Sequence, residues 1–132
     1  MDIIRRNTDY ALRIGLNLAQ RYGQKAVSAR ILSEEENVSY QLTCKLLQKL
    51  HKSGLVGSQM GPQGGYFLAH PPNETTLSSI VQAIQGPLSI NRCLFEKRIC
   101  PKQPDCPISK KLAELQDSVE SFLNNNTLGD LY

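Results

Sequence analysis

Three of the four cysteines in the 132-residue chain lie close together, at Cys93, Cys100 and Cys106. Thiolates at this density can bind a metal ion, hold an iron–sulfur cluster or form disulfides. The stretch CLFEKRICPKQPDC is rich in cations and proline, which makes it poor core material, and it lacks the closely paired cysteines typical of structural zinc. Because flanking cations offset a cluster's negative charge, an iron–sulfur cluster is favoured over zinc, which stays open.

The start of the chain bears on the disulfide alternative. MDIIRRNTDYALR carries charge at once and lacks the apolar stretch of a secretory signal. We therefore expect a cytoplasmic protein, in which thiols stay reduced and structural disulfides are disfavoured. Since no apolar run approaches the roughly 18 residues of a membrane span, no membrane partner is expected.

Positive charge is concentrated in the first half of the chain. Residues 1–70 hold nine Lys/Arg against five Asp/Glu, a net charge of +4, whereas residues 71–132 hold six against seven, a net charge of −1. The first half is therefore the candidate face for a polyanion. Charge alone favours the simpler interpretation of a solvated surface, so the case for nucleic acid depends on the predicted elements.

The elements that precede the cysteine segment begin with three predicted helices. Apolar residues at helical spacing predict helices over residues 8–22, 28–37 and 38–54. Asn7 or Thr8 is the expected cap of the first helix, because a short polar side chain at that place can accept a backbone hydrogen bond.

The second and third helices are short and separated by a tight turn. Ser28 and Ser39 are their expected caps, and Ile31 and Leu32 are expected to face inward from the second. Gly54 stands where a left-handed residue ends a helix. Two such helices, the second of them amphipathic with a Lys- and Gln-rich polar side, make a helix-turn-helix candidate.

A predicted hairpin follows directly. The stretch LVGSQMGPQGGYFLAHPP predicts a strand from Leu55, a GPQGG turn and a return strand from Tyr66 to Ala69. A hairpin behind a helix-turn-helix is a wing. Its glycines allow the backbone to approach a neighbouring surface such as a phosphate-lined groove.

The remaining segments complete the predicted organisation. A helix is expected from Thr76 to Gly86, and the prolines of the cysteine segment predict a loop. A long helix with a heptad-like apolar seam is expected from Ile108, and the tail NNNTLGDLY is expected to be partly ordered at best. The predicted units are a DNA-binding domain over residues 1–86, a cluster-binding loop over 87–107, and a dimerisation helix and tail over 108–132.

These motifs in this order resemble a known family over nearly the whole chain. The runs NTDYALR, LLQKLHKSGLV, GPQGGYFLAHPPNETTL and IQGP, followed by the three-cysteine loop and a long helix, resemble the Rrf-type winged helix-turn-helix regulators, which include IscR-, NsrR- and RirA-like proteins. The resemblance implies a mainly α fold with a small β-hairpin wing, a homodimer formed by the C-terminal helices, and a transcriptional regulator that binds a double-stranded DNA operator.

The resemblance also implies how a cluster is held. Cys93, Cys100 and Cys106 would supply three thiolates, and Asp9 of the partner's first helix would be the fourth ligand, because a carboxylate follows Thr in the nitric-oxide sensors of the family. Ser109 stands where the biogenesis regulators carry a ligand histidine. A 4Fe–4S cluster is favoured over a 2Fe–2S cluster. Asp9 has a simpler role as well, since an acidic residue near a helix start favours the helix dipole.

The same resemblance, with the register of the third helix, gives the candidate DNA contacts. Side chains near the start of that helix are placed to reach base edges, and basic residues around it can neutralise phosphates. Met60 stands where the biogenesis regulators carry an arginine, which argues against minor-groove reading by the wing. The candidates for base edges are Ser39, Tyr40, Gln41 and Lys45; those for phosphates are Arg30, Lys49 and Lys52; and Gln63 is the candidate in the wing.

The predicted function is therefore a regulator that senses redox, nitric oxide or iron status through an iron–sulfur cluster. A cluster-free, thiol- or zinc-responsive repressor on the same scaffold is the alternative, although the family's cluster-free members lack these cysteines. An iron–sulfur electron-transfer protein is a less favoured alternative, because that function would not explain the helix-turn-helix and the wing. An enzyme is not expected, because neither His51 nor His70 has a nucleophile constellation near it in the sequence.

Overall fold

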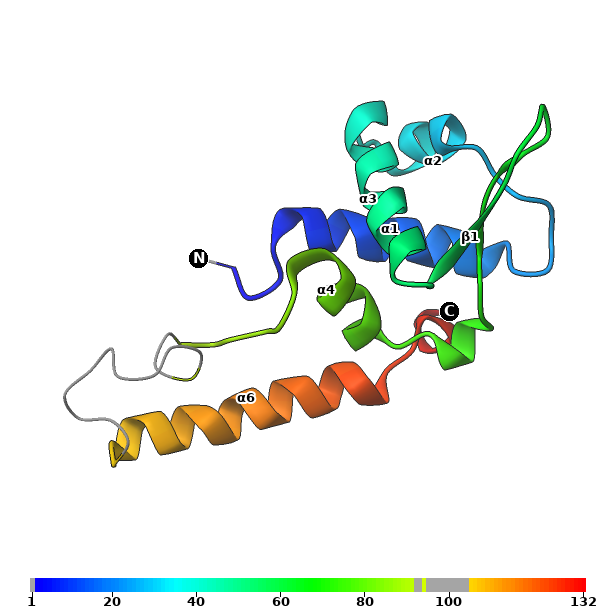
Figure 1. Ribbon diagram of the computed structural model, residues 1–132. Helices are drawn as coiled ribbons and strands as arrows, with labels where there is room; N and C mark the ends of the chain where they lie inside the picture. Colours follow the sequence, from blue (N-terminus) through cyan, green and yellow to red (C-terminus); the bar gives the residue numbers. More distant parts are fainter. Residues whose placement is uncertain (1, 92–93, 95–104) are drawn as a thin grey trace.

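The first helix, α1 (Arg6–Gln20), runs through the centre of the molecule, as seen in a computed structural model that describes residues 2–91, 94 and 105–132 (Figure 1). The expectation that Asn7 or Thr8 caps this helix is wrong. Arg5 is the cap residue, and Thr8 is fully buried one turn inside, where its hydroxyl donates to Gln85 Oε1 at 2.7 Å. Gln85 Oε1 also accepts from the Arg5 backbone N–H at 3.1 Å. A distant side chain thus does the work of a local cap.

The helix-turn-helix is confirmed by α2 (Ala29–Glu36) and α3 (Tyr40–Lys52). Ser28 and Ser39 cap them as predicted, each accepting a backbone N–H at 3.2 Å. Asn37 is left-handed, with φ of 56°, and makes the tight turn between them. Ile31 does not face inward: the buried residues of α2 are Ala29, Leu32 and Ser33, and the side chain of Ile31 is 43% exposed.

The wing is confirmed as the antiparallel hairpin of β1 (Val56–Gln59) and β2 (Gly65–Leu68), in a register that pairs Val56 with Leu68. A backbone bridge joins β2 to the residue before the α2 cap: Tyr66 N–H donates to the Val27 carbonyl at 2.7 Å, and Val27 N–H to the Tyr66 carbonyl at 2.9 Å. A Cβ on Gly65 would collide with the Val27 backbone, so glycine is required there. The wing is therefore fixed to the helix-turn-helix.

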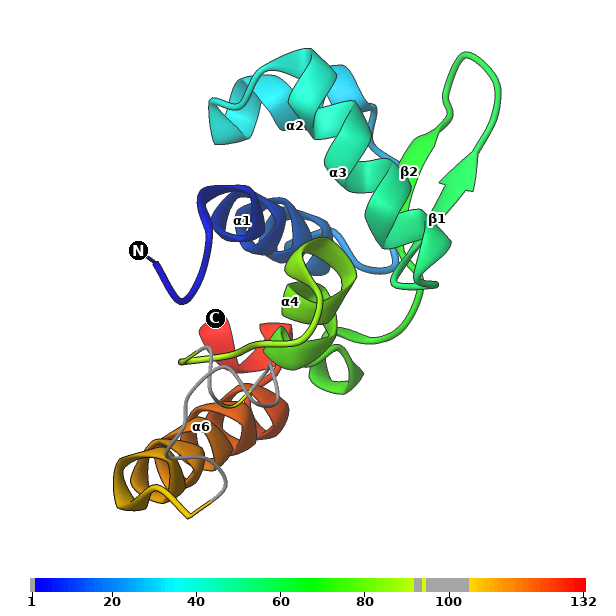
Figure 2. The same cartoon turned by 60° about the vertical axis from the view of Figure 1, so that its left-hand side comes forward.

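Beyond the short η1 turn (Pro72–Glu74), α4 (Leu77–Gln85) packs against α1, and Thr76 caps it as predicted. The last long helix, α6 (Pro107–Asn125), lies beside α4 and projects away from the helix-turn-helix and the wing (Figures 1 and 2). The predicted domain boundaries stay a prediction. No helix within residues 2–91 and 105–132 is long and apolar enough to cross a membrane.

The C-terminal tail is ordered, contrary to the sequence-based expectation. The η2 turn (Leu128–Leu131) lies beside η1, and Leu128 is completely buried against α1 and α4. Backbone bonds of 2.9 Å join Leu77 N–H to the Asn126 carbonyl and Leu128 N–H to the Thr75 carbonyl. The Tyr132 hydroxyl donates to the Ala19 carbonyl at 3.0 Å. A single leucine with backbone pairing on both sides holds the tail, and no periodic pattern in the sequence reveals that.

A polar cluster fastens α1 to α2. Arg21 pairs with Glu35 at 2.6 Å, and the Asn17 side-chain amide donates to Glu35 at 2.9 Å and to Glu36 at 2.7 Å. The hydrogen bonds from Asn17 and then Arg21 hold the pKa of Glu35 below its usual value. Polar contacts at the surface therefore hold α1 and α2 together in addition to their packing in the core.

Candidate nucleic-acid interface and cysteine segment

One face of α3 presents a row of polar side chains to solvent. Gln41, Lys45 and Lys49 recur every four residues and are all exposed, while Leu46 and Leu50 are buried in the core. The sequence of α3 contains three lysines and no acidic residue. This row can therefore approach a polyanion without repulsion from its own helix.

The start of that face is built from a stacked pair. The Arg30 guanidinium carbon of α2 lies 4.4 Å from the centroid of the Tyr40 ring, close enough for a cation–π contact. A hydrogen bond with the Cys44 thiol, strengthened by the Coulombic effect of that thiol, raises the pKa of the Tyr40 phenol. The stack fixes the place of the Arg30 charge at the junction of α2 and α3, and the edge donors of a guanidinium stacked by its face remain free to bind phosphate.

The other predicted contacts are distributed around α3 and the wing. Ser39 is exposed, but its hydroxyl oxygen caps α3, which leaves the hydroxyl hydrogen to donate. Lys52 is exposed at the last position of α3, and Gln63 is exposed in the turn of the wing. Met60 beside that turn is 94% exposed. All eight candidate DNA residues thus belong to the helix-turn-helix or the wing, and their contacts stay predictions.

The cysteine segment connects α4 to α6. Cys93 and Cys100 lie outside the described residues. Cys106 is half-buried, carries a free thiol and is the N-cap residue of α6, with Pro107 as the first helical position. Cysteine side chains are the usual ligands of iron–sulfur clusters, so Cys106 is chemically suited to hold one. Within residues 2–91 and 105–132 no group of three or more metal-binding side chains is gathered.

Asp9, the predicted fourth ligand, is exposed in the first turn of α1. It pairs with Arg13 at 3.5 Å, and the Arg13 guanidinium lies 4.8 Å from the Tyr10 ring centroid. Exposed ion pairs of this kind are weak, roughly 0–1 kcal/mol, so the carboxylate is available to another ligand. A thiolate at a helix start and an accessible carboxylate are donors that fit an iron–sulfur cluster.

Two glutamines that sequence reasoning missed connect these parts. Gln85, the last residue of α4, binds the start of α1 through both side-chain atoms. Gln116 of α6 accepts from Ile90 N–H at 3.1 Å and donates to Glu120 at 3.2 Å. Gln85 belongs to the run IQGP, but nothing in that run indicates its bonds to the start of α1, and Gln116 belongs to no motif or apolar row.

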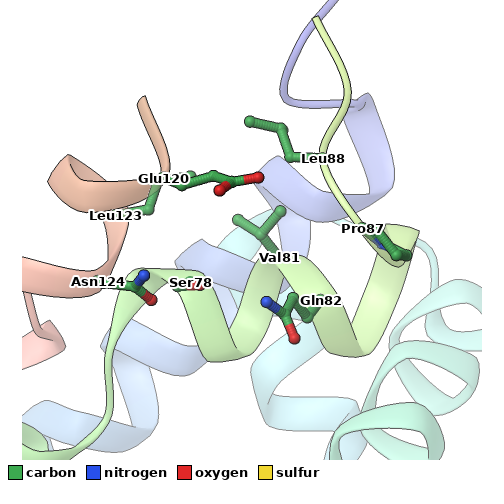
Figure 3. A pocket seen from close by; sticks show the side chains of 8 residues that line it. All are labelled: Ser78, Val81, Gln82, Pro87, Leu88, Glu120, Leu123 and Asn124. Carbon is green, nitrogen blue, oxygen red and sulfur yellow. The ribbon is translucent and has the colours of Figure 1, made fainter. Parts of the chain in front are cut away.

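A small cavity of about 130 Å³ lies between α4, the chain just after it, and α6. Figure 3 shows Glu120 and Leu123 of α6 beside Val81 of α4 and Leu88. Together with the bond from Ile90 to Gln116, these contacts attach residues 87–90, which precede the clustered cysteines, to α6.

A helix-turn-helix with a hairpin behind it and a basic exposed face define a winged-helix DNA-binding protein. The chain belongs to the Rrf2 family, whose model, described as "Iron-dependent Transcriptional regulator", matches residues 4–132. This confirms the family assignment, and it makes the protein a DNA-binding transcriptional regulator, since the relatives are regulators and not enzymes.

Three relatives illustrate the range of the family. The chain is 30% identical to the transcriptional regulator IscR of Pectobacterium carotovorum, over 92% of this chain and 74% of that protein. The solved structure of CymR, the global cysteine regulator of Bacillus subtilis, has a TM-score of 0.83 at 28% identity, covering 99% of this chain and 96% of that one. The structure of T. potens IscR has a TM-score of 0.76 at 27% identity, covering 97% and 84%. The chain is therefore similar both to IscR proteins and to CymR.

Proposed function

We propose that the protein is a homodimeric, cytoplasmic repressor that senses redox, nitric oxide or iron status through an iron–sulfur cluster, with 4Fe–4S favoured over 2Fe–2S. Cys93, Cys100 and Cys106 of one subunit and Asp9 of the partner would hold the cluster. The observation that carries this proposal is the set of three cysteines between α4 and α6, which ends at the N-cap of α6. Such a cluster supplies a redox-active, oxygen- and nitric-oxide-reactive centre when bound.

The exposed row on α6 supports the homodimer. Ile108, Leu115 and Phe122 recur every seven residues and are 69%, 50% and 63% exposed. Apolar side chains in such a row are typical of a helix that packs against another helix. A second copy of α6 is the natural partner. The seam is too short for an independent coiled coil, so the two helices would pair while each stays attached to its own DNA-binding domain.

The chain's own residues can carry a signal from the cysteine segment to the DNA face. Gln85 attaches the start of α1, which carries Asp9, to the end of α4, and the cysteine segment begins just beyond. Gln116 attaches Ile90 to α6. Movement of the segment would therefore displace α1 and α6 together. In a dimer, that displacement would change the distance between the two α3 helices.

Asp9→Ala tests the assignment of the fourth ligand. We expect the variant, purified without oxygen, to lose iron several-fold faster than the unchanged chain on exposure to air, because one ligand is missing. The measurement is iron and acid-labile sulfide per chain against time. Arg13→Ala is the matched control, since it removes the same ion pair and leaves the carboxylate. An Asp9→Ala variant as stable as Arg13→Ala would exclude Asp9 as a ligand.

The DNA face has its own test. On a duplex selected from random DNA by the protein, Lys49→Ala should lower the salt slope of binding by about 0.9 for each phosphate that the lysine neutralises, equally for selected and unrelated DNA. Gln41→Ala should instead reduce only the preference for the selected duplex, by about 1–3 kcal/mol for each base that the glutamine reads. An unchanged salt slope in Lys49→Ala would contradict the phosphate role, and an unchanged preference in Gln41→Ala would contradict base reading.

A cluster-free, thiol-responsive repressor is the second candidate, and the observation that favours it is the similarity to CymR over 99% of this chain. It predicts a protein without iron or sulfide whose DNA affinity changes on thiol oxidation. Zinc without sulfide would indicate the zinc-responsive form. Metal content therefore separates these candidates from the proposed function.

A further inference from the structure

A basic hollow lies at the C-terminal end of the exposed row on α3. It has a volume of about 400 Å³ and receives Lys49 from α3, Arg5 and Arg6 from the start of α1, and Gln85 from the end of α4. Residues far apart in the sequence thus place three cations around one concave surface.

These three cations lack the acidic partners that Arg13 and Arg21 have. Arg13 pairs with Asp9, and Arg21 pairs with Glu35. Among the residues that the structure describes, Arg5, Arg6 and Lys49 make no ion pair, and no carboxylate lines the hollow. An excess of positive charge confined to a hollow attracts an anion more strongly than the same charges spread over a convex surface.

The backbone that carries the two arginines is held in place. The Gln85 side chain accepts from Arg5 N–H at 3.1 Å and from the Thr8 hydroxyl at 2.7 Å, and it donates to the Ile3 carbonyl at 2.9 Å. These bonds use the Ile3 carbonyl, the Arg5 N–H and the Thr8 hydroxyl and neither arginine side chain, and Arg5 and Arg6 are both exposed. The backbone of the site is therefore already in place, and only the side chains must be ordered when an anion binds.

The hollow continues the face that we assign to DNA. Lys49 is the last member of the row that starts at Gln41, and eight residues of helix rise about 12 Å, close to the roughly 12 Å width of the major groove. A helix that reads bases near Gln41 therefore brings Lys49 close to the backbone at the edge of that groove.

We propose that Arg5, Arg6 and Lys49 together bind one phosphate of the DNA backbone beside the groove that α3 enters. The arginines add the start of α1 to the DNA interface, outside the helix-turn-helix and the wing. The proposal rests on the assignment of α3 as the reading helix. Phosphate contacts of this kind fix the register of the protein on the duplex without reading sequence.

The test is the double variant Arg5→Gln/Arg6→Gln in the full chain, with Lys110→Gln/Lys111→Gln on α6 as a control of equal charge change. Both are prepared alike and matched in iron content and in thermal unfolding. We expect the arginine variant to weaken binding roughly tenfold or more, to the same extent on selected and unrelated DNA, and to lower the salt slope by about 1 per subunit. The α6 control should leave the slope unchanged.

Three further comparisons complete the test. Arg5→Lys/Arg6→Lys should restore the slope, and adding Lys49→Gln to the double variant should lower it no further if all three hold one phosphate. In the unchanged protein, ethylation of one phosphate per half-site should block binding, and that block should disappear in the double variant. A salt slope equal to that of the α6 control, or an unaltered ethylation pattern, would overturn the proposal. Loss of base preference in Gln41→Ala would still support the reading helix in that case.

Discussion

Leu128→Ala is expected to lower the free energy of unfolding by about 2–5 kcal/mol, the range for removing a fully buried leucine. Leu128 is 0% exposed and lies in the core with α1 and α4. The tail that carries it is held to Thr75 and Leu77 by backbone bonds, so the cavity cannot close by a simple shift of the tail. Urea unfolding followed by circular dichroism measures the loss.

Leu131→Ala is the matched control for that prediction. It removes the same atoms from the same turn, but Leu131 is 49% exposed and lies outside the core. We expect a loss well below that of Leu128→Ala, because less apolar surface returns to water. Equal, small losses for both variants would show that the tail does not belong to the core in solution.

Cys106→Ser should have the largest effect on the cysteine segment: protein purified without oxygen should retain little or no iron. Cys106 is the cysteine that α6 holds in place, and serine is a poor ligand for iron in such a cluster. Iron, sulfide and zinc per chain measure the result. The fold is expected to survive, since the side chain is only half-buried and caps no backbone N–H.

Cys44→Ser provides the control. Cys44 is also half-buried, but it lies on α3 beside Tyr40 and packs against the core, far along the chain from the three clustered cysteines. It should keep the iron content of the unchanged protein. Iron loss in Cys44→Ser and retention in Cys106→Ser would reverse the ligand assignment.

The sequence predicts those parts of the fold whose determinants are local. Ser28, Ser39 and Thr76 cap their helices because each bonds a backbone N–H three residues away. The start of α1 could not be predicted, because the Arg5 N–H there donates to the side chain of Gln85, 80 residues away. The buried tail was missed for the same kind of reason: one leucine seated by long-range backbone pairing leaves no periodic pattern.

In the candidate DNA face, too, the local features can be predicted from the sequence and the contacts between helices cannot. Gln41, Lys45 and Lys49 share a face at helical spacing, so their joint exposure can be read from the sequence. The stack of Arg30 on Tyr40 and the meeting of Lys49 with Arg5 and Arg6 depend on how helices cross, which spacing within one helix does not determine. Tertiary packing therefore adds residues to the interface that no single motif contains.

We propose that the three-cysteine segment holds an iron–sulfur cluster in this winged-helix regulator. The most direct measurement is the visible spectrum of protein purified without oxygen, with iron and acid-labile sulfide per chain. We predict a broad band near roughly 400 nm and about four iron per chain, in line with thiolate ligation of a 4Fe–4S cluster. Colourless protein with no iron, or with zinc in its place, would contradict the claim and leave a DNA-binding regulator whose cysteines respond to another signal.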